Sequence, residues 1–342
     1  MKSNAQDKEI RRKRDADSRF LITGAKGFIG AWIVKNLIER EARPWVFDTD
    51  QNSHRLRALL SEEQLQQVGF IQGDVTRLED LERAVADQGI SYIIHLAALQ
   101  VPACAANPIQ GALVNVVGTV NVFEVARRNL NQVKRIVYAS SAAVFGPEEF
   151  YGGETVSESA VLHPLSHYGV FKECNEGNAR VYFASDGITS VGLRPWAVYG
   201  VGRDQGLTSA PTKAIKSIVL RRPYTIRFTG GVDMQYVNDT AHIFLECAEK
   251  DLTGAKVYSL RGSVIQVDDL LDALERVSPG ARRLIRAEGK QLPIAADLDD
   301  SALVRDLGEV PRTSLEDGIR ETMSIFEKLK SEGRLDTSDL ES

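Results

Sequence analysis

Three glycines at three-residue spacing, Gly24, Gly27 and Gly30, constrain the fold of this chain more than any other feature of its sequence. They follow a short apolar run at residues 19–23 and precede residues 31–40, where apolar side chains recur at helical spacing. A strand, a glycine turn and a helix in this order form the first unit of a nucleotide-binding α/β domain. The first glycine would make the tight turn, the second would let backbone approach a pyrophosphate, and the third would allow close helix–strand packing.

The alternation of strand and helix continues well beyond this unit. Apolar runs typical of buried strands occur at residues 44–47, 68–71, 92–96, 135–139 and 189–193, with helical patterns at 78–87, 111–129 and 168–184 between them. Such alternation predicts an α/β fold, a Rossmann-like doubly wound parallel sheet covered by helices on both faces. Beyond Gly200 the pattern is irregular, which predicts a smaller α/β substrate-binding lobe towards the C-terminus.

This pattern divides the chain into four predicted parts. They are a charged, disordered arm at 1–18, a dinucleotide-binding Rossmann domain at 19–199 to which part of 232–262 returns, a substrate-binding lobe at 200–330, and a flexible tail at 331–342.

An acidic residue closes the second predicted strand. Asp48 stands eighteen positions after Gly30, near the distance at which a carboxylate accepts hydrogen bonds from a ribose. A carboxylate there repels a 2′-phosphate, so it favours NAD over NADP. Lys26, in the glycine loop, would favour a phosphate instead. We give Asp48 the greater weight, because burying an unneutralised carboxylate beside a phosphate costs more than leaving a lysine in solvent.

A tyrosine and a lysine four residues apart, Tyr168 and Lys172, are the strongest candidates for chemistry. On a helix these positions share one face. A nearby ammonium lowers the pKa of a phenol, which would let Tyr168 act as an acid or base near neutral pH. Most such pairs are only a surface helix face, but this one follows a glycine loop and the strand-end serines Ser140 and Ser141.

Together these segments resemble the extended short-chain dehydrogenases/reductases of the NAD-dependent epimerase/dehydratase family, from Phe20 to about Lys328. The motifs that carry the resemblance lie at residues 23–30, 73–75, 95–98, 115–119, 140–146, 168–172 and 193–200.

The resemblance implies a role for each matching residue. Ser141, Tyr168 and Lys172 would be catalytic. NAD would be bound by Gly24, Gly27, Phe28, Ile29, Gly30, Asp48, Asp74, Val75, Leu96, Ala97, Ala98, Asn115, Ser140, Tyr168, Lys172, Pro195 and Val198. The substrate would meet Gln100, Ser141, Ala142, Trp196 and Gln235. No metal is expected.

Departures from the family pattern narrow the expected chemistry. Dehydratases carry an Asp-Glu pair directly after the catalytic hydroxyl residue, where this chain has Ala142 and Ala143. Nucleotide-sugar enzymes tend to carry an Asn and an Arg that hold the diphosphate, where this chain has Ala197 and Val232. Ala142 and Ala143 therefore make dehydration an unexpected reaction, and Ala197 and Val232 indicate that the substrate is not a nucleotide sugar.

The sequence favours NAD-linked oxidation or reduction of a secondary alcohol or ketone in a small carbohydrate-like substrate. One of three arginines in the substrate lobe, Arg221, Arg222 or Arg227, would suit an acidic substrate if it faced the site. Three alternatives stay open: an epimerase of sugars or nucleotide sugars with tightly bound NAD, a hydroxysteroid-type dehydrogenase, and a non-catalytic NAD-sensing protein.

Composition limits the partners. A net charge of −5 gives no basic field for nucleic acid, and no apolar run reaches membrane-spanning length. Three scattered cysteines favour a reducing compartment, so we expect a cytoplasmic protein. The family resemblance implies a homodimer joined through the helices predicted at 111–129 and 168–184.

Overall fold

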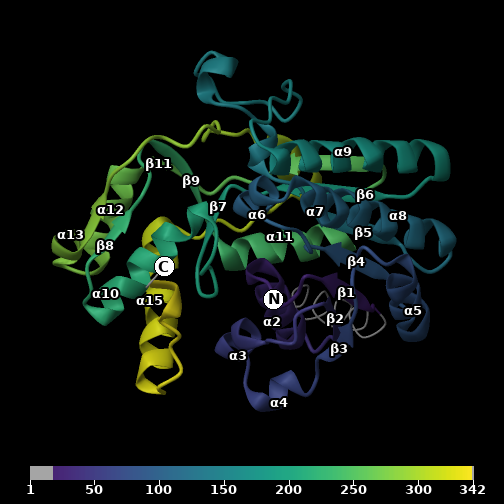
Figure 1. Ribbon diagram of the computed structural model, residues 1–342, viewed down its shortest axis with the longest axis horizontal. Helices are drawn as coiled ribbons and strands as arrows, with labels where there is room; N and C mark the ends of the chain where they lie inside the picture. Colours follow the sequence, from purple (N-terminus) through teal and green to yellow (C-terminus); the bar gives the residue numbers. More distant parts are fainter. Residues whose placement is uncertain (1–17, 341–342) are drawn as a thin grey trace, which may run out of the picture.

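The computed structural model describes residues 18–340, and its centre is a seven-stranded parallel sheet (Figure 1). The strands lie in the order β10 (Ala255–Ser259), β6 (Ser190–Arg194), β5 (Arg135–Ala139), β4 (Tyr92–His95), β1 (Phe20–Thr23), β2 (Pro44–Asp48) and β3 (Gly69–Gln72). The predicted Rossmann-like fold is thereby confirmed. Chain order reverses between β1 and β4, which is where open α/β sheets bind their ligands.

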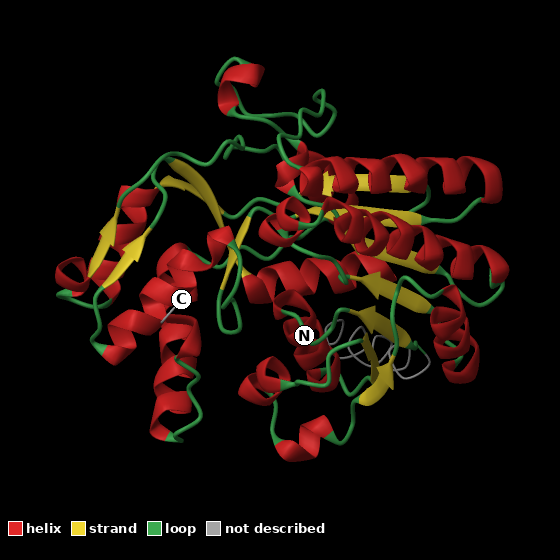
Figure 2. Cartoon of the chain, in the orientation of Figure 1, coloured by secondary structure: helices red, strands yellow, loops and turns green. Residues whose placement is uncertain are grey.

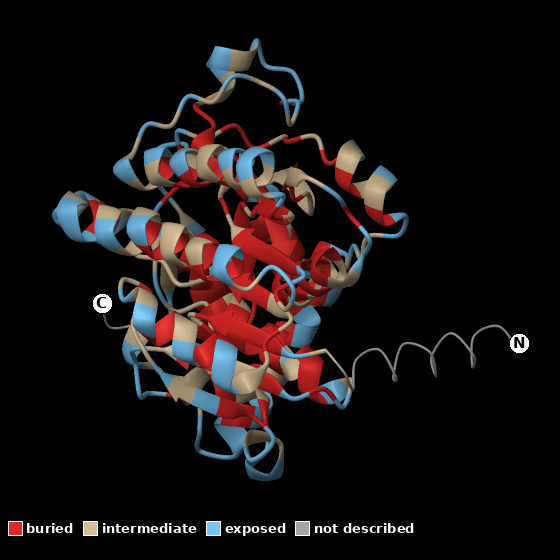
Figure 3. Cartoon of the chain, turned by 90° about the vertical axis from the view of Figure 1, so that its right-hand side faces the viewer, coloured by how far each residue is buried: buried red, intermediate tan, exposed pale blue. Residues whose placement is uncertain are grey.

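The sheet is buried on both faces, as continuous apolar strands require. Successive residues of a strand point to opposite faces, so each strand contributes to two cores. In β1, Ile22 packs into one apolar cluster and Leu21 into the other. Ile94 and Ile93 of β4 divide in the same way. Figure 3 shows these strands as the buried interior between two outer layers.

Two helical layers cover the sheet. On one face lie α2 (Phe28–Glu39), α3 (His54–Leu59) and α11 (Val237–Glu249), and on the other lie α5 (Leu78–Gln88), α8 (Gly118–Arg128) and α9 (His167–Asp186). Shorter elements in this half are α4 (Glu62–Leu65), α6 (Val101–Ala106), η2 (Ala142–Val144) and η3 (Glu148–Tyr151).

One long helical segment changes its winding in the middle. It consists of α7 (Pro108–Ala112), the π-helical turn η1 (Leu113–Val117) and α8. Among the described residues, the segment Pro108–Arg128 is the one helix long and apolar enough to cross a membrane by length and composition. It packs against α5 and α9, and a core helix passes the same test.

A smaller lobe follows the strand β7 (Ala197–Tyr199). Its sheets are β11 (Ser263–Gln266), β9 (Gly231–Tyr236) and β7, and β12 (Ile285–Ala287) with β8 (Tyr224–Ile226). Its helices are η4 (Leu207–Ser209), α10 (Ala210–Leu220), α12 (Val267–Val277), α13 (Ala281–Leu284), α14 (Ser301–Leu307) and α15 (Leu315–Ser331) (Figure 2). Between β9 and β11 the chain crosses back, since α11 packs on α2 and β10 pairs with β6.

The C-terminal segment differs from its prediction. Residues 331–342 are predicted to be a flexible tail, but the described part packs on the lobe and ends in η5 (Ser338–Leu340). The Lys216 ammonium donates to Asp339 Oδ1 at 2.7 Å and to the Asp336 carbonyl at 3.0 Å. The predicted arm at 1–18 lies outside the described residues except for Ser18.

Candidate active site

A cavity of about 690 Å³ opens at the carboxyl ends of β1 and β4, at the reversal point of the sheet. Most residues predicted to bind cofactor line it: Gly24, Gly27, Phe28, Ile29, Gly30, Asp48, Asp74, Val75, Leu96, Ala97, Ala98, Ser140, Tyr168, Lys172, Pro195 and Val198. The lining also includes Ser141 and three of the predicted substrate contacts, Gln100, Ala142 and Trp196.

The glycine loop at one end of the cavity has room only for glycine. Gly24 has a φ of +68°, and a Cβ there would lie 2.6 Å from the backbone nitrogen of Ala97. A Cβ on Gly30 would lie 2.6 Å from the Cα of Ala25. Helix α2 starts after Gly27 with no side-chain cap, so its first backbone N–H groups are available to an anion. These features fit a pyrophosphate.

Asp48, at the end of β2, is held in place by backbone. Its Oδ2 accepts from the Lys26 N–H and its Oδ1 from the Asp50 N–H, each at 3.1 Å. The Lys26 ammonium donates to the Asp50 carbonyl and lies 5.6 Å from the ring centre of Phe70. The Lys26 ammonium is thus bonded to a carbonyl and not to Asp48, so the Asp48 carboxylate is left for ribose hydroxyls, which supports the preference for NAD.

Ser141, Tyr168 and Lys172 meet at the middle of the cavity. Ser141 precedes η2, where its Oγ accepts from the Ala143 N–H at 3.1 Å. Tyr168 lies in the first turn of α9, and Lys172 follows one turn later on the same side. The Lys172 Nζ lies 5.4 Å from the centre of the Tyr168 ring and donates to the Ala139 carbonyl at 2.6 Å.

The protonation of this group differs from the sequence prediction. Burial raises the pKa of Tyr168, and the Ser141 hydroxyl and the Arg203 charge only partly oppose that rise. Burial also lowers the pKa of Lys172 to about 8. In the protein without cofactor, desolvation outweighs the attraction of phenolate for a nearby ammonium, so the predicted lowering of the Tyr168 pKa is not present.

Ser140 is fixed by a buried charged pair behind the site. Its hydroxyl donates to Glu176 Oε1 at 2.6 Å. The same carboxylate accepts from Nε and a terminal nitrogen of Arg194 at 2.8 and 2.7 Å. Arg194 precedes Pro195, so the pair joins α9 to two segments that line the cavity, the end of β5 and the end of β6.

Asn115 does not line the cavity, contrary to its predicted cofactor contact. The π-helical turn buries its amide, which spans the backbone of Leu99: Oδ1 accepts from the Leu99 N–H at 2.7 Å and Nδ2 donates to the Leu99 carbonyl at 2.9 Å. The Asn115 side chain therefore fixes the conformation of the segment that comes after β4 and runs along the cavity.

Gln235 also lies outside the cavity, contrary to its predicted substrate contact. Its Oε1 accepts from the Trp196 N–H at 3.0 Å, and its Nε2 donates to Asp233 Oδ2 at 2.7 Å and to the Leu260 carbonyl at 2.9 Å. All of its polar atoms are used inside the protein, so it positions Trp196 instead of meeting a substrate.

The cavity has two arginines that the sequence interpretation missed, Arg55 and Arg203. The Arg203 guanidinium lies 5.8 Å from the centre of the Phe28 ring; one terminal nitrogen donates to Thr208 Oγ1 at 2.8 Å, and the buried Nε has no partner among the described residues. The arginines considered from sequence, Arg221, Arg222 and Arg227, do not line the cavity. Arg203 could have been found from its position in the sequence, since it comes three residues after the family motif at 193–200.

The residues at which this chain departs from the family pattern lie in different parts of the structure. Ala142 and Ala143 line the cavity, so no acidic pair stands beside Ser141. Ala197 and Val232 are buried in the β7–β9 sheet and do not reach it. The acidic residues of the lining, Asp48, Asp50 and Asp74, are all at the cofactor end.

Comparison with known proteins agrees with this arrangement. The family model described as NAD dependent epimerase/dehydratase family matches residues 20–260. The chain belongs to this family. A UDP-glucose 4-epimerase of Mycolicibacterium smegmatis is 28% identical over 318 residues, which cover 90% of this chain and 98% of that protein.

Solved structures of other proteins share the fold. The NAD complex of UDP-glucose 4-epimerase from Thermus thermophilus superposes with a TM-score of 0.76 at 25% identity, covering 90% of this chain and 98% of that one. A partial-consensus L-threonine 3-dehydrogenase has a TM-score of 0.79 at 23% identity, with 91% and 99% covered. The cofactor is NAD, and the glycine loop, the α2 N-terminus and Asp48 are the residues that fit it.

Proposed function

We propose that the protein is an NAD-dependent dehydrogenase that interconverts a secondary alcohol and a ketone in a small, polar, carbohydrate-like substrate. One observation carries the proposal: Ser141, Tyr168 and Lys172 line the same cavity as the glycine loop and Asp48. A hydroxyl, a phenol and an ammonium beside a nicotinamide site are the groups that alcohol oxidation needs.

Each residue has a defined part in the oxidation. Ser141 donates a hydrogen bond to the substrate oxygen and holds it near Tyr168. The Tyr168 phenolate takes the hydroxyl proton while the C–H bond breaks and the C=O bond forms. The Lys172 charge, together with the positive charge of the nicotinamide when NAD is bound, would offset the rise in the Tyr168 pKa that burial causes without cofactor, and Lys172 would also hold the cofactor ribose. When bound, NAD accepts the hydride that leaves the substrate carbon.

The charge of the cavity supports an anionic or hydroxylated substrate. Arg203 brings a cation to the substrate side, and the lining residues there include no acid. Gln100 and Thr208 add polar atoms, while Leu207 and Ile294 provide apolar wall. A small sugar acid has the charge and the hydroxyl groups that suit this surface.

An epimerase is the second candidate. The relative from M. smegmatis bears that name, and epimerisation would use the same three side chains. Ala197 and Val232 weigh against a nucleotide-sugar epimerase, because the family's amide and guanidinium are missing at those positions. Hydroxysteroid oxidation and NAD sensing are weaker candidates, the first because Arg203 is charged and the second because the three reactive side chains are intact.

The test is a panel of polyols, aldoses and sugar acids incubated with the protein and NAD. Absorbance should report formation of NADH with at least one of them. Tyr168→Phe should lower the rate about 10²- to 10⁴-fold, the usual contribution of a general acid or base. Tyr182→Phe, on the same helix but bonded to Glu124, is the matched control and should keep the rate.

Other outcomes select the alternatives. Isomerisation of a sugar seen by NMR without NADH formation would indicate the epimerase. NADH formation only with hydroxysteroids would indicate that branch. Tight NAD binding with no reaction, unaffected by Tyr168→Phe, would indicate a sensor. We also propose that the protein acts in the cytoplasm as a homodimer.

A further inference from the structure

A loop from the substrate lobe lies across the cofactor half of the molecule. It runs from β7 to η4 over residues 200–206 and carries Arg203 into the cavity. Gly202 has a φ of +97°, and a Cβ there would lie 3.4 Å from the Phe28 ring and 3.5 Å from Arg55 Cδ. The loop therefore packs directly on residues next to the glycine turn.

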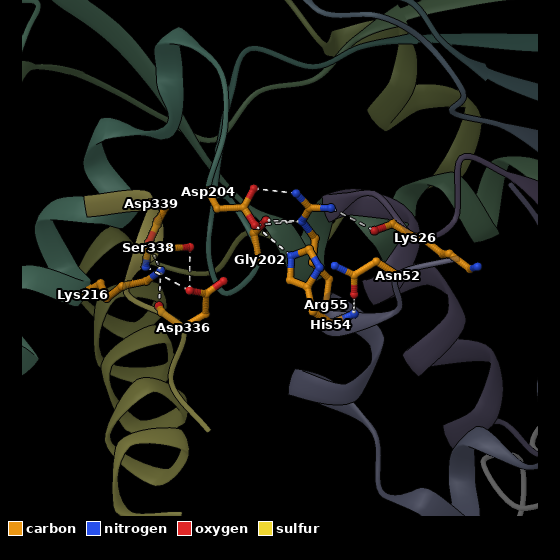
Figure 4. A network of polar contacts seen from close by, with 10 residues as sticks. All are labelled: Lys26, Asn52, His54, Arg55, Gly202, Asp204, Lys216, Asp336, Ser338 and Asp339. Atoms are coloured by element: carbon orange, nitrogen blue, oxygen red, sulfur yellow. Dashed lines mark hydrogen bonds and ion pairs between the residues drawn. The ribbon is translucent and has the colours of Figure 1, made fainter. Parts of the chain in front are cut away.

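Arg55 of α3 donates hydrogen bonds to this loop from its Nε and from one terminal nitrogen. Its Nε donates to the Gly202 carbonyl at 3.1 Å and to Asp204 Oδ2 at 3.0 Å. A terminal nitrogen donates to Asp204 Oδ1 at 2.6 Å. Figure 4 shows this forked pair, with His54 also reaching Asp204 at 3.2 Å. A planar guanidinium makes such a fork, and an ammonium does not.

The other terminal nitrogen of Arg55 reaches the cofactor loop, where it donates to the Lys26 carbonyl at 3.1 Å. The backbone N–H of Lys26 donates to Asp48 Oδ2 at 3.1 Å. Both backbone groups of Lys26 are thus held, the N–H by the Asp48 carboxylate and the carbonyl by Arg55; Figure 4 shows the bond from Arg55. The chain of bonds runs from Asp48 through Lys26 and Arg55 to Asp204, the neighbour of Arg203.

We propose that Arg55 and Asp204 are positioning residues that couple NAD binding to the placement of Arg203 on the substrate side of the cavity. Binding of NAD fixes the glycine loop, the fixed Lys26 carbonyl holds Arg55, and Arg55 holds the loop that carries Arg203. Coupling of this kind is measured at both ends of the chain of bonds, at the glycine loop and at the loop that carries Arg203. It rests on NAD binding and not on the reaction proposed above.

Hydrogen exchange of the full chain, with and without saturating NAD, tests the coupling without any substrate. Peptides covering residues 22–30 report occupancy of the cofactor site, and peptides covering 200–209 report the loop. In the wild type, NAD should slow exchange in both regions, by about fivefold or more in the loop, the lower end of usual couplings between sites. In Arg55→Lys and in Asp204→Asn, NAD should slow exchange only at residues 22–30.

The control is Arg276→Lys, which alters an exposed ion pair with Glu316 and should behave as wild type. A merely structural pair would speed exchange equally with and without NAD. The proposal would be overturned if NAD still slowed exchange in the loop of both variants. It would also be overturned if, in the wild type, NAD slowed exchange at residues 22–30 but not in the loop. If NAD did not slow exchange at residues 22–30 of the wild type, the assignment of the cofactor site would itself be wrong. The experiment therefore distinguishes a failure of NAD binding from a failure of the coupling.

Discussion

Arg194 and Glu176 form a forked ion pair inside the protein, with side chains 5% and 1% exposed. The arginine is the last residue of strand β6, the glutamate lies in the middle of α9, and Ser140 donates to the same carboxylate. Both charges are shielded from solvent. The pair therefore fixes the backbone on which Ser141 and Pro195 stand.

Replacing Glu176 by Gln leaves the Arg194 guanidinium buried without its counter-charge. We expect a loss of about 3–5 kcal/mol in the free energy of unfolding, which urea denaturation would measure. The control Glu316→Gln alters an exposed pair and should cost less than about 1 kcal/mol. Equal effects of the two substitutions would contradict the role given to the buried pair.

Lys172 links stability to pH. Its pKa in the folded protein, about 8, lies below the ordinary value of 10.5 because burial disfavours the ammonium. Between those two pH values the unfolded chain binds more protons than the native protein, so this group's contribution to stability rises with pH across the window. Below pH 8 the buried charge opposes folding in full.

Lys172→Met should therefore stabilise the cofactor-free protein at pH 7 by about 1–2 kcal/mol, allowing for the lost bond to the Ala139 carbonyl. The gain should shrink as the pH rises from 8 to 10.5, as denaturation curves at each pH would show. Activity should fall at every pH. A destabilised variant at pH 7, or a gain independent of pH, would argue against a buried ammonium.

Asp48 should set the choice of cofactor. Asp48→Ser removes the charged acceptor for ribose hydroxyls, so NAD should bind about 10- to 100-fold more weakly. NADP should lose much less, since its 2′-phosphate no longer meets a carboxylate. Titration of each nucleotide by intrinsic fluorescence measures both. An unchanged ratio of the two affinities would show that Asp48 does not select NAD.

The proposed homodimer has a candidate surface. Leu113, Val117, Val170 and Val181 are apolar, 40–62% exposed, and lie on η1 and α9. Val181→Asp should convert the dimer to a monomer in light scattering after size exclusion. Val161→Asp, at an even more exposed valine in the loop before α9, should not. A wild-type protein of monomeric mass would contradict the proposal directly.

Local pattern was sufficient to predict the sheet, the glycine loop and the meeting of Tyr168 with Lys172, because each depends on neighbours in the sequence or on a family motif. The contacts of Arg55 with Asp204 were not predictable, since they join residues about 150 positions apart. The direction of the Tyr168 pKa was missed for a related reason. Burial is a property of the folded chain, and it outweighs the charge that the sequence places nearby.

The π-helical turn at Leu113–Val117 makes this part of the chain unusually intolerant of changes in length. A π turn accommodates one residue more than an α-helix would, and each residue of a helix advances it by about 100°. Deleting a single residue there would restore a regular α-helix, in which the residues between α7 and α8 would no longer be spaced as they are now. Asn115 could not then span Leu99 while α8 kept its apolar face on the sheet.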